Sequence, residues 1–200
     1  MAPATAHRDM YLRDGKPQTN LSQIGPLAIG VPGAVAGYHQ AVRDHGKLDF
    51  EKSLTHAAKH ATEGFEISEV YAERMRATLR HLKVHAPGLL HADGSAYKAG
   101  ERLVQADLGK TMRRLANDGP DYFYKGEFSL KAGKWISENG GVIEPKDFAN
   151  YKTVVREPVR TKYRDYEIVG FPPPSSGGVH VAQILNILES FDLKLSLIHI

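Results

Sequence analysis

Two pairs of histidines have the spacing at which a helix could present both rings to one metal ion. His56 and His60 are four residues apart, as are His81 and His85, and residues at this spacing project from the same helix face. A zinc peptidase motif also requires a glutamate directly after the first histidine, and a third ligand. Here alanine and leucine follow the first histidines of the two pairs. The pattern favours solvated or packed histidines, and we predict no metal site and no cofactor.

Glycines in Gly30-Val31-Pro32-Gly33 have part of the density of a phosphate-binding loop. The stretch lacks the Lys-Ser/Thr that ends a P-loop, and no G-x-G-x-x-G follows an expected strand. We therefore interpret these glycines as a close approach of the chain to the start of a helix, and we predict no nucleotide site there.

Ser175-Ser176-Gly177-Gly178 lies where backbone chemistry could occur, directly before an expected helix. Backbone N–H groups at a helix N-terminus can bind an anion or stabilise an oxyanion. Serines in this place can equally cap the helix, and the G-x-S-x-G nucleophile elbow is absent. A hydrolase that used Ser175 or Ser176 would need a histidine and an acid nearby, and His180 follows too closely to serve. From the residues alone, capping is the favoured interpretation.

The elements that must position these residues are helices bounded by caps and stops. Asp49 and Ser68 are expected N-caps, and glycine or Pro-Gly follows several expected helix ends. After a loop-rich segment, residues 1–32, we expect helices at 33–45, between the Asp49 cap and the Gly64 stop, between the Ser68 cap and Pro87-Gly88, at 106–116 and at 127–138. The apolar stripe expected for the third of these helices consists of Val70, Met75, Leu79 and Leu82.

The pattern changes period in the last third of the chain. Alternation rich in Val, Tyr and Ile predicts the two strands of a β-hairpin at residues 152–160 and 162–171. A polyproline-like connector, residues 172–174, then leads to a last helix at about 179–190. Nothing marks a linker, so we predict a single α+β domain over residues 1–200.

Composition and charge exclude several other classes of function. The 200 residues are 42% hydrophobic and carry 26 basic and 23 acidic side chains, for a net charge of +3 without any run of five like charges. A nucleic-acid groove, which needs clustered basic residues, is therefore not expected. The absence of cysteine excludes disulfides and Cys-based zinc sites. No apolar run approaches the ~18 residues of a membrane span, and residues 1–9 lack the apolar core of a signal peptide.

Five segments resemble stretches of the gamma-glutamyltranspeptidase family and occur in that family's order. Residues 1–4 and 8–12 resemble M-A-P-A…R-D-M-[YF]-L, and residues 30–37 resemble G-[VT]-P-G-x-V-A-G. Residues 119–126 resemble G-P-D-x-F-Y-[KR]-G, and residues 139–151 resemble N-G-G-x-[IL]…D-[LF]-A-x-Y. Residues 172–186 resemble P-P-P-S-S-G-G-x-H…Q-[IM]-L-N. The similarity extends over residues 1–193. No single motif establishes it, but five motifs in the order of the family do.

This resemblance implies an N-terminal-nucleophile hydrolase with an αββα sandwich, made as one precursor that cuts itself before a threonine. The new N-terminal threonine, with its own α-amino group as general base, attacks the γ-glutamyl amide of glutathione or a related compound. Preorganised N–H donors hold the oxyanion, and the acyl group passes to water or to an amino acid. An arginine of the large subunit pairs with the substrate α-carboxylate. The family also implies a periplasmic or extracellular location.

Carried over residue by residue, most of these roles fall outside residues 1–200. The sequence contains no Thr-Thr-His, so the nucleophile is expected in a small subunit, the partner of this chain. The carboxylate-binding arginine belongs to an R-E-M-A-P-A stretch whose last four residues are Met1-Ala2-Pro3-Ala4. We therefore assign no catalytic or substrate-binding residue, and we interpret Ser175, Ser176, Gly177 and Gly178 as a wall of the active site. Residues 195–200 match nothing in the family and are expected to be a non-native tail.

Two hypotheses remain. The leading one is an incomplete large subunit of a γ-glutamyl hydrolase and transferase, which supplies the helical portion and a β-hairpin of the αββα sandwich and is inactive as residues 1–200 alone. The alternative is a binding module without enzymatic activity that retains the helical part of the fold. A naturally terminated and expressed chain would favour the second hypothesis.

Overall fold

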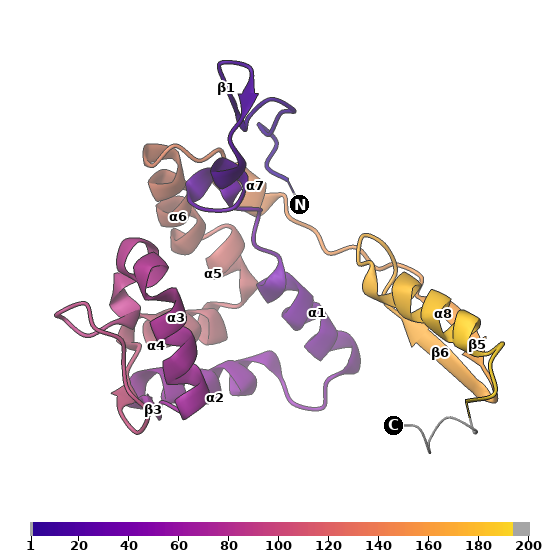
Figure 1. Cartoon of the computed structure of the whole chain (residues 1–200). Helices are drawn as coiled ribbons and strands as arrows, with labels where there is room; N and C mark the ends of the chain where they lie inside the picture. The colour runs from indigo at the N-terminus through magenta and orange to yellow at the C-terminus, as the bar shows by residue number, and fades with distance from the viewer. Residues whose placement is uncertain (1, 194–200) are drawn as a thin grey trace. The chain divides into compact units, whose positions relative to one another are not determined.

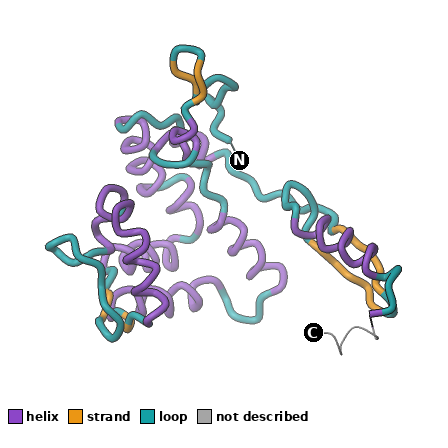
Figure 2. The backbone as a smooth tube through the Cα atoms, in the orientation of Figure 1, coloured by secondary structure: helices purple, strands orange, loops and turns teal. Residues whose placement is uncertain are grey.

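Helices dominate the computed structural model, which describes residues 2–193 (Figures 1 and 2). The described residues also contain three antiparallel sheets of two strands each, so the α+β class predicted from the sequence is confirmed. Contacts divide the chain into two units, Met1–Thr153 and Val154–Ile200. No helix in the described part of the chain is long and apolar enough to cross a membrane.

The first unit is built from helices and two short ladders. Its helices are α1 Ala34–His45, α2 Phe50–Glu63, α3 Glu69–His85, α4 Ala106–Asp118, α5 Pro120–Tyr124, α6 Glu127–Glu138 and α7 Pro145–Ala149. Its three short 3-10 helices are η1 Thr19–Ser22, η2 Pro26–Ala28 and η3 Pro87–Leu89. The ladders pair β1 Leu12–Arg13 with β2 Lys16–Pro17, and β3 Phe65–Glu66 with β4 Arg102–Leu103.

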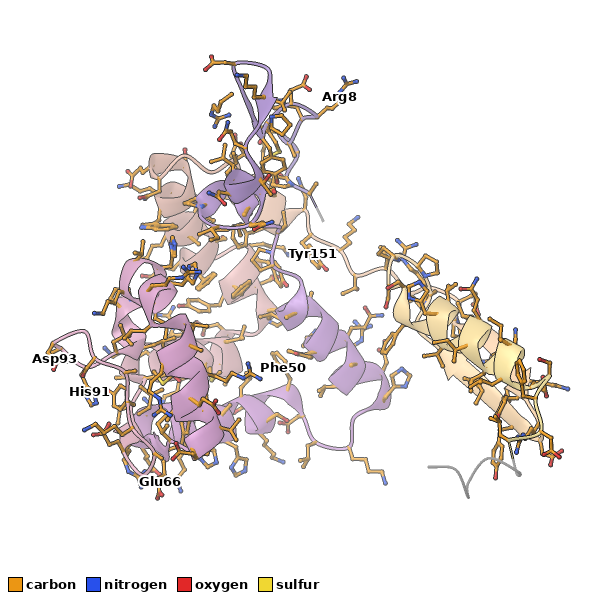
Figure 3. All side chains as sticks on the ribbon, viewed as in Figure 1. Arg8, Phe50, Glu66, His91, Asp93 and Tyr151 are labelled. Carbon is orange, nitrogen blue, oxygen red and sulfur yellow. The ribbon has the colours of Figure 1, made fainter. Side chains whose placement is uncertain are left out.

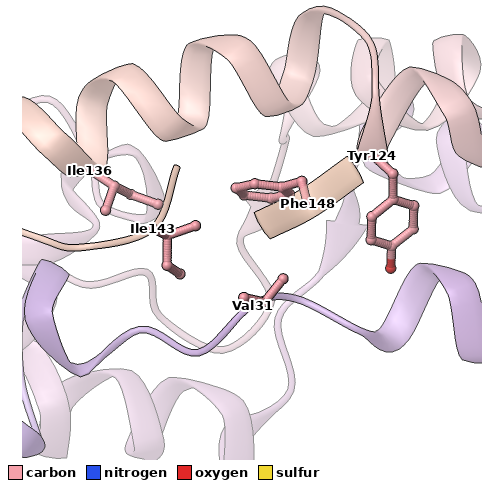
Figure 4. Close-up of a cluster of buried hydrophobic side chains, with 5 residues drawn as sticks. All are labelled: Val31, Tyr124, Ile136, Ile143 and Phe148. Carbon is pink, nitrogen blue, oxygen red and sulfur yellow. The ribbon is translucent and has the colours of Figure 1, made fainter. Parts of the chain in front are cut away.

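Two hydrophobic clusters hold this unit together. One joins the Gly30–Gly33 turn to α5, α6 and α7 (Figure 4), and its buried members are Val31, Tyr124, Ile136, Ile143 and Phe148. The other packs α3 beneath the β3–β4 ladder, and its buried members are Ile67, Ala72, Met75, Leu90 and Leu103. Helix α2 packs closely on α4, where Gly109 faces Ala58 and Thr62.

The predicted helix caps are confirmed by their hydrogen bonds. The Asp49 carboxylate accepts the N–H of Lys52 at 2.7 Å, and the Ser68 hydroxyl accepts the N–H of Tyr71 at 3.2 Å. One member of the predicted stripe on α3 is wrong, because Val70 is 68% exposed. Met75 comes five positions after Val70, and five positions correspond to a rotation of roughly 140° around a helix. The two side chains therefore cannot share one face.

Two short helices and one ladder are among the elements that were not expected from the sequence. Helix α5 begins at Pro120, directly after the Gly119 that ends α4, and α7 begins at Pro145. Each has only five residues, too few to show a helical period. The β3–β4 ladder pairs Phe65 with Leu103 and Glu66 with Arg102, residues 38 and 36 positions apart, and no local pattern encodes such a pairing.

The second unit is a β-hairpin covered by one helix. Strands β5 Val159–Tyr163 and β6 Tyr166–Gly170 pair in an antiparallel register that sets Val159 opposite Gly170, and α8, Gly177–Leu188, packs on them. A hairpin is confirmed, but its first strand begins at Val159 and not at residue 152, and the predicted turn near Thr161 is wrong. The turn contains Arg164 in the left-handed region, with φ of 53°, and an arginine there gives no sequence signal. Residues 195–200, the expected non-native tail, lie outside the described residues.

Candidate functional site

The predicted wall segment, Ser175–Gly178, lies where β6 leads into α8. After the hairpin the chain passes through Pro172, Pro173 and Pro174, with a cis peptide bond between the last two, and the N–H of Ser175 donates to the carbonyl of Pro172 at 3.2 Å. Helix α8 begins at Gly177, two residues earlier than predicted. The four residues therefore form the turn and the first residues of α8.

A close approach of two glycines fixes this segment against the hairpin. A methyl group on Gly170 would lie 2.8 Å from the Cα atom of Gly178, and one on Gly178 would lie 2.9 Å from the carbonyl carbon of Gly170. Such separations exclude any side chain at either position. The start of α8 therefore rests directly on the end of β6, backbone against backbone.

The two serines have different roles. The Ser175 hydroxyl accepts the N–H of Gly177 at 3.4 Å, so it helps to cap α8, whereas Ser176, in the N-cap position, makes no side-chain cap bond. The N–H of His180 donates to the carbonyl of Ser176 at 2.9 Å within the first turn of α8. Both serines and His180 are exposed. The geometry gives these serines a capping and surface position, and no described contact activates either hydroxyl.

Helix α8 is apolar on two faces. Leu185 and Leu188 are half-buried against the hairpin, whereas Val181, Ile184 and Ile187, spaced three residues apart, are exposed on another face at 47%, 54% and 62%. A helix that is apolar around most of its circumference is typical of a helix buried on several sides. The outer face of α8 is therefore suited to pack against a further protein layer.

At the other end of the motif set, the M-A-P-A segment is held by α7. The N–H of Ala4 donates to the buried carboxylate of Asp147 at 2.8 Å, and the Thr5 hydroxyl donates to the carbonyl of Val142 at 2.7 Å. Asp147 was not identified as a functional residue from the sequence. The Glu144-Pro145-x-Asp147 pattern could have predicted a capping box with proline at the first helical position, but not the contact with Ala4.

Tyr124 holds the Gly30–Gly33 turn. Its hydroxyl accepts the N–H of Ala36 at 3.0 Å and donates to the carbonyl of Pro32 at 3.0 Å. The ring of Tyr151 (Figure 3) stacks on that of Tyr124, with 5.7 Å between centroids, and closely approaches Gly33. Burial raises the pKa of Tyr124, the Ala36 N–H opposes this shift, and Tyr151 adds to it. The turn therefore approaches a helix start, as predicted.

A loop between η3 and β4 carries a further group of titratable side chains (Figure 3). His91 Nε2 lies 3.0 Å from a Glu101 oxygen that also accepts the N–H of Lys98 at 2.6 Å, and the His91 ring stacks on Tyr97. The Lys98 N–H, followed by His91, lowers the pKa of Glu101 below its ordinary value. These contacts close the loop on itself, and its exposed position gives no enclosed site.

Among the residues that the structure describes, neither histidine pair is joined by a third potential metal ligand. His56 and His60 lie on α2, and His81 and His85 lie on α3, as their spacing required. The Nε atom of Arg80 lies 3.2 Å from the His81 ring, which places a cation beside that pair. Across residues 2–193, no three His, Asp or Glu side chains gather in a way that could hold a metal ion.

Comparisons with known proteins agree with this arrangement. A family model described as gamma-glutamyltranspeptidase matches residues 1–198. A glutathione hydrolase proenzyme of Escherichia coli is 40% identical over 198 residues, covering 97% of this chain and 34% of that protein. An acylase ACY 1 proenzyme of a Pseudomonas species is 36% identical over 204 residues, covering 96% of this chain and 36% of that protein.

Solved structures show the same fold. A crystal structure of gamma-glutamyltranspeptidase from Helicobacter pylori superposes with a TM-score of 0.92 at 35% identity, covering 96% of this chain and 56% of that one. The fold therefore places the chain in the N-terminal-nucleophile hydrolase class. Within that class, the chain belongs to the gamma-glutamyltranspeptidase family. It spans about a third of the length of the curated relatives it matches.

Proposed function

We propose that this chain acts as part of the large subunit of a glutathione hydrolase, which cleaves γ-glutamyl amides and passes the γ-glutamyl group to water or to an amino acid. The observation that carries the proposal is the match of nearly the whole chain to a glutathione hydrolase proenzyme in sequence and to a gamma-glutamyltranspeptidase in fold. Both units of the chain would belong to one domain of that enzyme.

In the proposed enzyme, the nucleophile is a threonine of the small subunit, which forms an acyl-enzyme with its own α-amino group as base. An arginine outside residues 1–200 binds the substrate carboxylate in this proposal, and Ser175–Gly178 forms a wall of the site without acting as a nucleophile. The capping contact of Ser175 and the backbone contact of Gly178 support a structural role for this wall.

Residues 1–200 alone are therefore inactive in this proposal, because they contain no Thr-Thr-His. The missing partner is the small subunit of the same precursor, and the exposed apolar face of α8 supports the need for a further protein layer. Glutathione or another γ-glutamyl compound is the substrate. The proposed location, from the family, is the periplasm or the outside of the cell.

A chimeric precursor tests the proposal. Residues 1–193 of this chain replace the matching stretch of the E. coli glutathione hydrolase proenzyme, with which the chain shares 40% identity. We expect the chimera to cut itself into two subunits, seen by gel electrophoresis, and to release p-nitroaniline from γ-glutamyl-p-nitroanilide. The 200-residue chain alone should give no release above the blank.

Two outcomes would contradict the proposal. A chimera that is folded by circular dichroism, but neither cuts itself nor hydrolyses the anilide, would favour the binding module. Hydrolysis by the 200-residue chain alone would show that its own residues suffice, and would require a nucleophile other than the small-subunit threonine. A chimera with its predicted threonine replaced by alanine serves as the inactive control.

A further inference from the structure

One buried carboxylate joins the start of the chain to a helix 143 residues away. Asp147 is 4% exposed, and its Oδ1 atom accepts the N–H of Ala4 at 2.8 Å. Its Oδ2 atom accepts the N–H of Glu144 at 2.9 Å, which forms half of the capping box of α7. Each oxygen therefore has a backbone donor, as a buried carboxylate requires. The bond to Ala4 goes beyond capping, because it leaves α7 altogether.

Further hydrogen bonds show that Ala4 belongs to a turn that is held against the rest of the unit. The N–H of Ala6 donates to the carbonyl of Pro3 at 3.1 Å, and the Thr5 hydroxyl donates to the carbonyl of Val142 at 2.7 Å. Pro3 itself is buried. Two hydrogen bonds therefore hold the turn Pro3–Ala6. The backbone N–H of Ala4 donates to the Asp147 carboxylate, and the Thr5 hydroxyl donates to the carbonyl of Val142.

The residues that bind the turn Pro3–Ala6 adjoin the hydrophobic core. Ile143 and Phe148 are 0% and 1% exposed and belong to the hydrophobic cluster around Val31 (Figure 4). Asp147 directly precedes Phe148, so its backbone adjoins one of the most buried positions of the unit. A group placed by such packing has little freedom to move.

We propose that Asp147 is a positioning residue for the substrate-carboxylate site: by holding Ala4, it fixes the Ala2–Ala4 stretch, which is close in sequence to the expected carboxylate-binding arginine. This inference rests on the proposed function. Asp147 acts on the arginine only through the backbone of the segment that contains Ala4. Its carboxylate already accepts the N–H groups of Ala4 and Glu144, so it does not compete with the substrate for the arginine. Loss of the contact should weaken substrate binding, whereas the chemical step should be largely preserved.

The chimera with the E. coli proenzyme provides the assay, with two variants of Asp147 and one control. Asp147→Ala removes both acceptors, and Asp147→Asn keeps the shape but can accept only one of the two N–H groups. Glu144→Ala removes the other half of the capping box without touching Ala4, so it reports the cost of weakening α7 alone. The quantities measured are KM and kcat for γ-glutamyl-p-nitroanilide, together with the extent of self-cleavage.

We expect Asp147→Ala to raise KM about tenfold with kcat changed less than about twofold, the pattern of lost uniform binding. Glu144→Ala should leave KM within about twofold of the unsubstituted chimera. Equal effects of Asp147→Ala and Glu144→Ala, or a KM that Asp147→Ala leaves unchanged in an active chimera, would overturn the positioning role alone. An unsubstituted chimera that is folded and inactive would overturn the proposed function, and the positioning role with it.

A milder variant covers the case in which neither Asp147 variant matures. Thr5→Val removes the second anchor at an exposed position, where the fold tolerates the change. We expect it to raise KM about two- to threefold with kcat preserved. An unchanged KM in this variant, beside Asp147 variants that fail to mature, would assign Asp147 a role in folding only and would overturn the inference.

Discussion

Replacing Tyr124 by phenylalanine removes one hydroxyl group from the start of α1. That hydroxyl accepts the N–H of Ala36 and donates to the carbonyl of Pro32, both at 3.0 Å. The ring, its stacking on Tyr151 and its volume are retained. Helix α1 has no buried residue of its own, so its attachment to the unit depends strongly on contacts of this kind.

The expected loss of stability follows from the two bonds. Each intramolecular hydrogen bond contributes about 0.5–1.5 kcal/mol net, and a part-buried partner left unsatisfied adds to the cost. We therefore expect Tyr124→Phe to lower the free energy of unfolding by about 1–3 kcal/mol. The effect should concentrate in α1, because the rest of the cluster around Phe148 keeps its apolar contacts.

Urea unfolding followed by circular dichroism measures the global change, and amide hydrogen exchange of residues 34–45 measures the local one. Tyr38→Phe is the matched control, because Tyr38 lies on α1, the helix whose exchange is measured, and is 67% exposed. A Tyr124→Phe change within about 0.5 kcal/mol of the control, the range of ordinary surface substitutions, with unchanged exchange in α1, would refute the role given to the hydroxyl.

The same tyrosine predicts a dependence on pH. Burial raises the pKa of Tyr124, so the folded state binds this proton more tightly than the unfolded state. The corresponding stability is fully present below the unfolded-state pKa of about 10 and is lost as the pH rises through the folded-state pKa. Unsubstituted protein should therefore lose stability above about pH 10 more steeply than Tyr124→Phe. Parallel curves would show that Tyr124 titrates as it does in the unfolded chain.

Four further changes test other contacts. Gly178→Ala forces a methyl group against the backbone of Phe171 and Gly170 and should destabilise the protein by about 1–3 kcal/mol in thermal unfolding. Gly109→Ala forces a methyl group against the Thr62 hydroxyl of α2, with the Ala58 carbonyl oxygen 3.2 Å away, and should cost a similar amount, about 1–3 kcal/mol, in urea unfolding. Asp49→Ala removes the cap of α2 and should cost about 0.5–2 kcal/mol in the same measurement. Ile184→Lys on the outer face of α8 should lower the fluorescence of an apolar dye bound to the chain without moving its unfolding midpoint.

Matched glycines provide the controls for the first two of these changes. Gly177→Ala places its methyl group 3.6 Å from the Ser175 hydroxyl, an ordinary contact, and Gly37→Ala meets nothing within 4 Å. Gly37→Ala should even stabilise α1, by up to about 1 kcal/mol. Equal losses at both members of a pair would contradict the packing argument. For Asp49→Ala the contradiction would be unchanged hydrogen exchange in α2, and for Ile184→Lys it would be unchanged dye fluorescence.

Local signals in the sequence determined most of the helices and the family. Asp49 and Ser68 cap helices that begin one residue later, and Gly46 and Gly64 follow the helices that they were expected to end. Each of these signals acts within a few residues, because a cap or stop bonds to its own helix end. The order of the family motifs is likewise a property of the sequence, and the family match over residues 1–198 confirms it.

Within the candidate site, the sequence placed Ser175–Gly178 before a helix, but only the tertiary structure showed what holds it there. The contact between Gly170 and Gly178 depends on the hairpin turning at Arg164, where φ is positive without a glycine. The bond from Ala4 to Asp147 depends on the packing that buries Phe148. A hydrogen bond between residues 143 positions apart leaves no local pattern, because its geometry exists only after the intervening helices have packed.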